Sequence, residues 1–152
     1  MENNIPFPQA DDFQKIVNLI NVCNDDNLSD NRFVSSALGD VTDRQVLYYL
    51  SAAAYLGIVD NTRGCRKFTD YGIKVKNMNS FIQEAELISI ILRLPVFSKV
   101  FVLEKMVGHQ NVDDVTVLIK ESFPSFSDAI CERRAQTVIK WLKWVNEKLN
   151  QY

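Results

Sequence analysis

A stripe of Arg, hydroxyl and aromatic side chains over residues 42–56 is the strongest candidate for chemistry in this 152-residue sequence. On a helix that turns about 100° per residue, the stripe consists of Arg44, Tyr48, Ser51 and Tyr55. The opposite side is expected to be buried and consists of Val46, Tyr49, Leu50 and Ala53. The guanidinium of Arg44 and the amide of Gln45 suit base edges in a DNA major groove, and hydroxyls suit phosphates. The outward tyrosines suit a protein contact equally well.

A basic segment follows this helix. Short strands are predicted over residues 58–60 and 67–69, with a polar loop over residues 61–66 between them. The cations in and beside the loop are Arg63, Arg66 and Lys67. A hairpin tip of this kind, next to a helix that reads bases, could contact the phosphate backbone. The alternative is an ordinary solvated hairpin loop.

Helices that position these residues are predicted from apolar spacing, caps and breaks. In the first half they run from Asp11 or Asp12 to the break at Asn24–Asn27, then over 31–38, 44–56 and 70–78. Thr42 and Thr69 are expected to cap two of them, and Asp43 suits a first turn. The second half is predicted to be entirely helical, over 81–92, 95–107, 112–121 and 128–149. The expected domains are residues 1–80, with an N-terminal arm, and residues 81–152.

Two of the later helices carry an apolar stripe of their own. For the helix over 81–92, the predicted buried residues are Ala85, Ile88, Ile91 and Leu92. For the last helix, which Ser127 is expected to cap, they are Val138, Leu142, Val145 and Leu149, with Trp141 on the flank. The residues expected to point outward there are Arg133, Gln136, Lys140 and Trp144, with Thr137 at the edge. An outward Trp144 would indicate a contact surface; the alternative is that it packs on the first half.

Composition argues against several classes of protein. The chain is 47% apolar and 24% charged, with a net charge of −2, as is usual for a soluble globular protein. It has a single histidine, His109, and neither paired-cysteine metal motifs nor a phosphate-binding glycine loop. Cys131 with His109 as a catalytic pair lacks supporting spacing. We therefore expect a protein that is not an enzyme and that holds no metal or cofactor. Three widely spaced cysteines and the lack of a signal or membrane segment favour the cytoplasm.

Charge is unevenly distributed along the chain. Residues 1–30 carry a net charge of −5 and residues 31–80 a net charge of +3, and the remaining segments 81–126 and 127–152 carry −2 and +2. A local basic patch matters more to a phosphate backbone than the total charge does. The segment 31–80, which contains the candidate helix and hairpin, is thus the more basic part of the first half.

The segment over residues 30–78 resembles the winged-helix superfamily. The resemblance is carried by TDRQVLYYLSAAAYLGIVD and the later KFTDYG, and it covers about a third of the chain. It implies a helix-turn-helix with helix 42–56 in the major groove and loop 61–66 as the wing. The segment SDAICERRAQTVIKWLKWV over residues 127–145 resembles a second recognition helix in winged-helix modules that accompany bacterial restriction–modification systems. Unlike that pattern, no wing follows this helix, so either the second unit is a wingless helix-turn-helix or the chain is a fragment of a larger protein. The expected fold class is therefore mainly α with one small β-hairpin, a winged helix-turn-helix followed by a second, wingless unit.

Two functions follow as expectations. The first is a non-catalytic module that binds double-stranded DNA as a regulatory or targeting component of a restriction–modification system, with a homodimer reading two half-sites. Its DNA-binding residues would be Thr42, Arg44, Gln45, Tyr48, Ser51, Arg63, Arg66, Lys67, Arg133, Gln136, Thr137 and Lys140. The second is a winged helix that docks onto a protein, such as a nuclease or methyltransferase subunit, through Tyr48, Tyr55 and Trp144.

Overall fold

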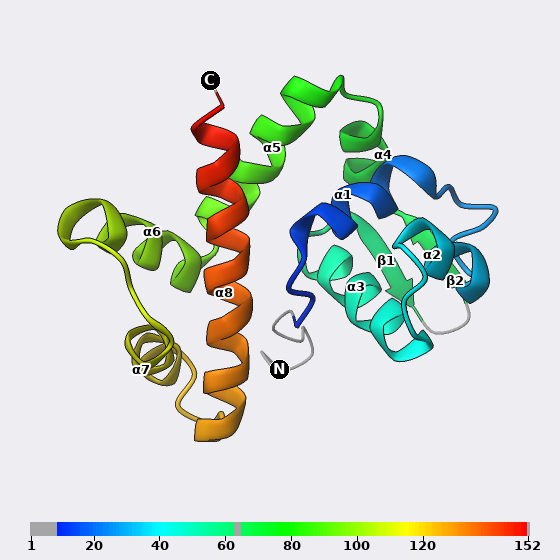
Figure 1. Cartoon of the computed structure of the whole chain (residues 1–152). Coiled ribbons are helices and arrows are strands. Elements are labelled where there is room, and N and C mark those ends of the chain that lie inside the picture. The colour runs from blue at the N-terminus through cyan, green and yellow to red at the C-terminus, as the bar shows by residue number, and fades with distance from the viewer. Residues whose placement is uncertain (1–8, 63–64, 152) are drawn as a thin grey trace. The chain divides into compact units, whose positions relative to one another are not determined.

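The computed structural model describes residues 9–62 and 65–151 of the chain. Over these residues the fold is mainly α, with eight helices and one two-stranded antiparallel hairpin (Figure 1). This is the mixture that the sequence predicts. The chain divides into two compact units, Met1–Gln83 and Glu84–Tyr152. The division falls inside helix α5 (Ser80–Arg93), whereas the expected boundary lay at residues 78–80.

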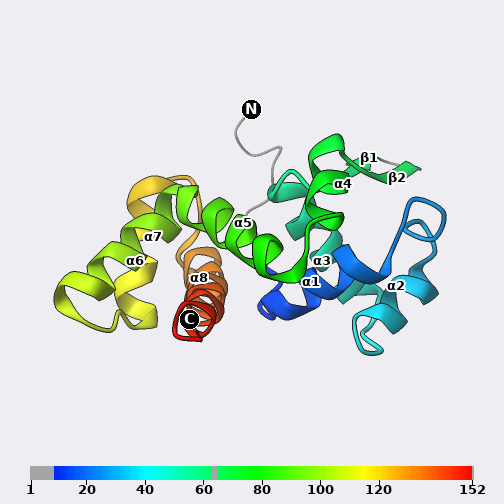
Figure 2. The same cartoon turned by 90° about the horizontal axis from the view of Figure 1, so that it is seen from above.

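The first unit contains three helices, a hairpin and a short fourth helix. In chain order these are α1 (Phe13–Val22), α2 (Asn31–Ala37), α3 (Asp43–Tyr55), β1 (Val59–Thr62), β2 (Cys65–Phe68) and α4 (Asp70–Lys76). Helices α1, α2 and α3 pack on one another, and β1 packs on α3. Fully buried apolar side chains from the three helices, together with Ile58 just before β1, form the core; they include Phe13, Ile16, Ile20, Val34 and Leu50. In the view from above in Figure 2, the hairpin of β1 and β2 lies beside α4.

Side-chain caps begin the helices of this unit. Asp12 and Asp30 cap α1 and α2, and Thr42 and Thr69 cap α3 and α4 as the sequence predicts. Each cap oxygen accepts a hydrogen bond from a backbone N–H that has no partner within the helix. The start of every helix here is therefore set by a short polar side chain directly before it.

The hairpin is held by side chains from the α1–α2 connection. Asp25 accepts a hydrogen bond from the backbone N–H of Phe68 at 2.8 Å. The Arg66 guanidinium donates to the Asn31 side chain at 2.7 Å and to the Leu28 carbonyl at 3.4 Å. Because these bonds join residues more than 30 positions apart, they fix the hairpin against the start of α2.

Helix α4 is held against the rest of the unit at both ends. At its start the Thr69 hydroxyl donates to the Gly57 carbonyl at 2.6 Å. At its end the Lys76 ammonium donates to the Ile20 and Cys23 carbonyls at 2.9 and 2.5 Å. These carbonyls lie at the negative end of α1, where a positive charge is favourable.

The second unit contains the later part of α5 followed by α6 (Pro95–Val107), α7 (Val112–Ser122) and α8 (Asp128–Leu149). Pro95 stands in the first turn of α6 and Ser127 caps α8, as predicted. Helices α6 and α7 both pack on α8, the long helix coloured orange to red in Figure 1. Phe97 and Trp141 meet in this core with ring centres 5.3 Å apart.

Four expectations about local structure are wrong. The strands run two residues further into the predicted loop 61–66, so Arg66 lies on β2. On α5 the buried residues include Leu87, Ile90 and Ile91, whereas Ala85 is exposed, and Ile88 and Leu92 are only half-buried. Leu149 is 45% exposed although its spacing predicts a core position. Trp144, expected to point outward, is 9% exposed. Helix α8 buries a broader face than one stripe because two helices pack on it.

None of the helices in the described ranges combines the length and apolar character that crossing a bilayer requires. The same ranges contain no group of three or more His, Cys, Asp or Glu residues placed to hold a metal ion.

Candidate nucleic-acid interface

The start of α3 presents polar side chains at the surface. Thr42, Arg44 and Gln45 are all exposed there. Thr42 Oγ1 accepts from the Gln45 backbone N–H at 3.2 Å, and Gln45 Oε1 accepts from the Thr42 backbone N–H at 3.1 Å. In this reciprocal capping box Gln45 Oε1 is already an acceptor. The Nε2 group of Gln45 takes no part in the box. The backbone N–H groups of this first turn also give the helix start a partial positive charge.

Arg44 and Tyr48 form a pair one turn apart on α3. Arg44 Nε donates a hydrogen bond to the Tyr48 hydroxyl at 2.6 Å. The guanidinium carbon also lies 5.5 Å from the centre of the Tyr48 ring, within cation–π range. Arg44 is exposed and Tyr48 is half-buried. The guanidinium is therefore held at the surface by a phenol that is itself packed into the unit.

The rest of the predicted stripe lies closer to the protein interior. Ser51 and Tyr55 are half-buried, and burial raises the pKa of the Tyr55 phenol above its ordinary value. The predicted core residues Val46, Tyr49, Leu50 and Ala53 are all buried. The face of α3 that remains accessible is its first half, where Leu47 is 48% exposed between the polar side chains.

The basic residues of the hairpin have different environments. Lys67 is exposed on β2, where it stands opposite Asp60 in the strand register. Arg66 is half-buried and directed to Asn31 and the Leu28 carbonyl. Arg63 lies outside the described residues. Arg66, predicted as a phosphate contact on a loop, thus anchors the hairpin, and Lys67 is the exposed cation on this strand.

Helix α2 contributes two exposed residues that the sequence reasoning missed. Arg32 is exposed in the first turn of α2, and Phe33 beside it is 37% exposed. In a helix-turn-helix the first helix crosses the phosphate backbone while the second reads bases. A helical wheel of residues 31–37 would have placed Arg32 opposite the buried Val34, but so short a segment gives a weak periodic signal.

The predicted residues of the second unit are only partly accessible. Gln136 and Lys140 are exposed on α8, as expected, and Arg133 is half-buried. Thr137 is completely buried, which removes it from any surface. Arg133 Nη1 donates a hydrogen bond to Thr137 Oγ1 at 3.4 Å. The exposed stripe of α8 also contains Glu132 and Glu147, so its charge is mixed rather than basic.

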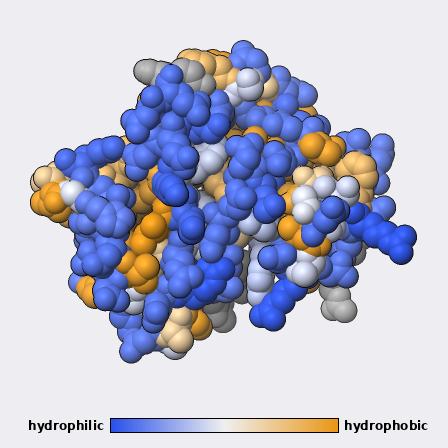
Figure 3. All heavy atoms as spheres, viewed as in Figure 1, coloured by the Kyte–Doolittle hydropathy of each residue, from blue (hydrophilic) through white to orange (hydrophobic). Residues whose placement is uncertain are grey.

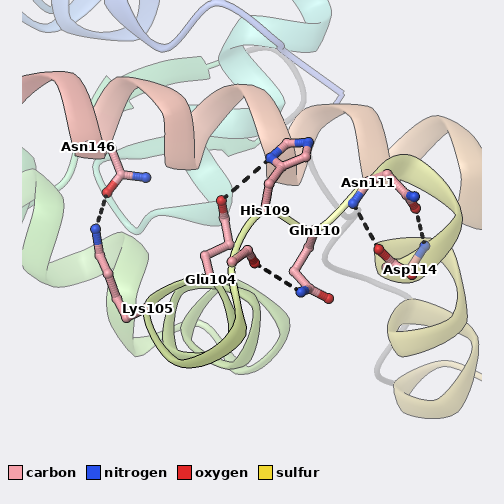
Figure 4. Close-up of polar contacts among 8 residues, drawn as sticks. Glu104, Lys105, His109, Gln110, Asn111, Asp114 and Asn146 are labelled. Carbon is pink, nitrogen blue, oxygen red and sulfur yellow. Dashed lines mark hydrogen bonds and ion pairs between the residues drawn. The ribbon is translucent and has the colours of Figure 1, made fainter.

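The connection between α6 and α7 contains the single histidine (Figure 4). His109 is 75% exposed, with Nδ1 at 3.9 Å from a Glu104 carboxylate oxygen. Asn111 and Asp114 form the capping box of α7, with hydrogen bonds of 3.0 and 2.9 Å. Cys131, the other member of the considered catalytic pair, is completely buried. The Glu104–His109 contact and the Asn111–Asp114 capping box thus stabilise the α6–α7 connection and the start of α7.

Apolar side chains are also exposed at the molecular surface. Figure 3 shows orange apolar atoms among mostly blue hydrophilic ones, including a patch over the α6 and α7 part of the chain. Val102, Met106 and Val107 on α6 are 51%, 73% and 72% exposed. In the first unit the exposed apolar residues next to the polar start of α3 are Phe33 and Leu47.

Residues 15–150 match a protein family described as a domain of unknown function, DUF7226. The chain belongs to the DUF7226 family. The DUF7226 match begins in α1 and ends after α8, so it spans both compact units. No curated protein and no solved structure matches the chain.

Proposed function

We propose that this protein binds double-stranded DNA through the first half of α3. The observation that carries the proposal is the exposed group of Arg44, Gln45 and Thr42 at the start of a helix that follows a short helix and a tight turn. This order of elements, with a two-stranded hairpin after the second helix, supports the winged-helix resemblance. In such domains the start of the second helix reaches base edges.

Exposed cations beside α3 would supply affinity in this proposal. Arg32 on α2 and Lys67 on β2 lie on elements that pack next to α3 or pair with its neighbour β1. Contacts of this kind with phosphates release counterions, so binding weakens steeply as salt rises. The unit offers few such cations, which favours a homodimer that binds two half-sites. We also propose the cytoplasm as its location, since Cys23, Cys65 and Cys131 are free.

The test is fluorescence anisotropy of a labelled random duplex at about 50 and about 200 mM salt. We expect binding at the lower concentration and a loss of at least about 10-fold at the higher one. Lys67→Ala should weaken binding about 5-fold on every sequence and make the salt dependence shallower by about one unit of slope. Lys74→Ala is the matched control, because Lys74 is an exposed lysine of the same unit on α4, an element outside the candidate interface. Failure to bind any duplex at low salt would overturn the proposal.

A second function is favoured by one specific observation, the exposure of Phe33 and Leu47 beside the polar start of α3. Apolar groups of this size among Arg and Tyr side chains are typical of protein contacts. In this function the winged helix would dock onto a nuclease, a methyltransferase or another protein. Binding to such a subunit that resists salt and is lost in Leu47→Asp would favour this function over DNA binding.

A further inference from the structure

The contact between Arg44 and Tyr48 leaves one particular part of the guanidinium for a ligand. Its Nε is engaged by the Tyr48 hydroxyl at 2.6 Å. The terminal nitrogens Nη1 and Nη2 take no part in that bond. Together they form a planar fork of N–H donors. The guanidinium plane and the fork direction are both restricted, because the same side chain also lies over the Tyr48 ring.

A fork presented by its two terminal nitrogens matches one base in the major groove. Guanine offers two acceptors there, O6 and N7, and a bidentate Arg contact to them is the commonest specific contact in protein–DNA complexes. Adenine presents an acceptor beside a donor, which repels one arm of the fork. Holding the guanidinium before binding reduces the rotamer freedom that the contact would otherwise remove.

We infer that Arg44 reads a guanine, and that Tyr48 is the positioning residue that sets its specificity. This inference rests on the proposed function and deepens it by naming the base. Tyr48 holds Arg44 through its hydroxyl, while its ring supports the guanidinium face. Removing only the hydroxyl should therefore reduce the preference for guanine while leaving the fold and the phosphate contacts in place.

The experiment begins with selection of duplexes from a randomised library by the full chain. We expect the selected pool to contain a position occupied mainly by guanine. Replacing that guanine by 7-deazaguanine removes the N7 acceptor without changing base pairing. It should weaken binding of the wild-type chain about 10-fold, because one of the two hydrogen bonds of the bidentate contact is lost while the bond to O6 stays. With Arg44→Ala the same replacement should change affinity less than about 2-fold.

Tyr48→Phe tests the positioning role directly. It should reduce the 7-deazaguanine effect to about 3-fold or less, whereas Tyr55→Phe, the matched control on the same helix, should leave it at about 10-fold. Arg44→Lys should weaken the guanine preference, since an ammonium can still contact O6 and N7 but has no planar fork that Tyr48 can hold. If Tyr48→Phe keeps the full effect, or the Arg44→Ala chain still selects guanine, the inference is wrong although DNA binding stands. If the wild-type chain binds no duplex at low salt, the proposed function itself fails.

Discussion

Replacing Gly72 by alanine should destabilise the first unit, although helix propensity alone predicts the opposite. Gly72 is buried inside α4, and alanine is favoured over glycine in a helix by about 1 kcal/mol. A Cβ at this position would lie 1.9 Å from the Ile58 carbonyl oxygen and 2.9 Å from its carbon. Both are backbone atoms, so no side-chain rotation can relieve the overlap. Helix α4 would have to move away from the residue that precedes β1.

The magnitude follows from the contacts that this movement breaks. Ordinary contact between carbon and oxygen requires a shift of more than about 1 Å. Thr69, which caps α4, donates its backbone N–H to the Ile58 carbonyl at 2.9 Å and its hydroxyl to the Gly57 carbonyl at 2.6 Å. A shift of that size weakens both hydrogen bonds, at about 1 kcal/mol each, and loosens the packing of the fully buried Val75. After the propensity gain, the net loss in the free energy of unfolding should be about 3 kcal/mol.

Urea denaturation followed by circular dichroism measures this loss. The control is Gly57→Ala, since Gly57 has a φ of +78° but nothing within 4 Å of an added Cβ. It should cost only the left-handed backbone strain, about 1 kcal/mol. If the Gly72→Ala chain is as stable as the wild type, or less destabilised than Gly57→Ala, α4 does not approach the Ile58 carbonyl closely enough to exclude a Cβ.

Three further predictions concern contacts within the first unit. Lys76→Met should lower the free energy of unfolding by about 2 kcal/mol in urea denaturation, because the ammonium bonds to the Ile20 and Cys23 carbonyls are lost; an unchanged midpoint would contradict this. Arg66→Ala and Asn31→Ala should show a coupling of about 1 kcal/mol in a double-mutant cycle, and strictly additive effects would mean that their hydrogen bond contributes nothing. Burial raises the pKa of the Cys23 thiol above its ordinary value of 9.0. Above pH 9 the folded chain therefore keeps a proton that the unfolded chain releases. The contribution of Cys23 to the free energy of unfolding should be constant below pH 9 and should fall as the pH rises above it. Cys23→Ala should show a smaller fall than the wild type between about pH 8 and about pH 10, and equal falls would exclude the thiol as a cause.

Much of the local structure could be predicted from the sequence because its causes are local. Thr42, Thr69 and Ser127 begin helices by accepting a hydrogen bond from the backbone N–H three residues further on. The buried side of α3 follows from apolar spacing within four turns, and Val46 and Leu50 are fully buried as predicted. The exposed Arg44 at the start of that helix follows from the same wheel.

The parts that could not be predicted depend on which elements meet. Arg66 looks like a free loop cation in the sequence, but its partner Asn31 is 35 residues away. The close approach at Gly72 depends on the path of the backbone at Ile58, which no spacing rule describes. The exposed Arg32 next to α3 likewise becomes a candidate only when α2 and α3 are seen to pack together.

Local sequence patterns are enough to predict that the chain is mainly helical, where most helices begin, and which side of α3 is buried. These properties arise from hydrogen bonds and apolar periodicity within a few residues along the chain. The burial of Thr137 and Trp144, the anchoring of the hairpin by Arg66 and the contact of Tyr48 with Arg44 depend on how the folded elements pack. A helix buries a second face when further helices pack on it, and a side chain meets a distant partner only when the chain has folded. Neither event can be predicted from the residues of a single segment.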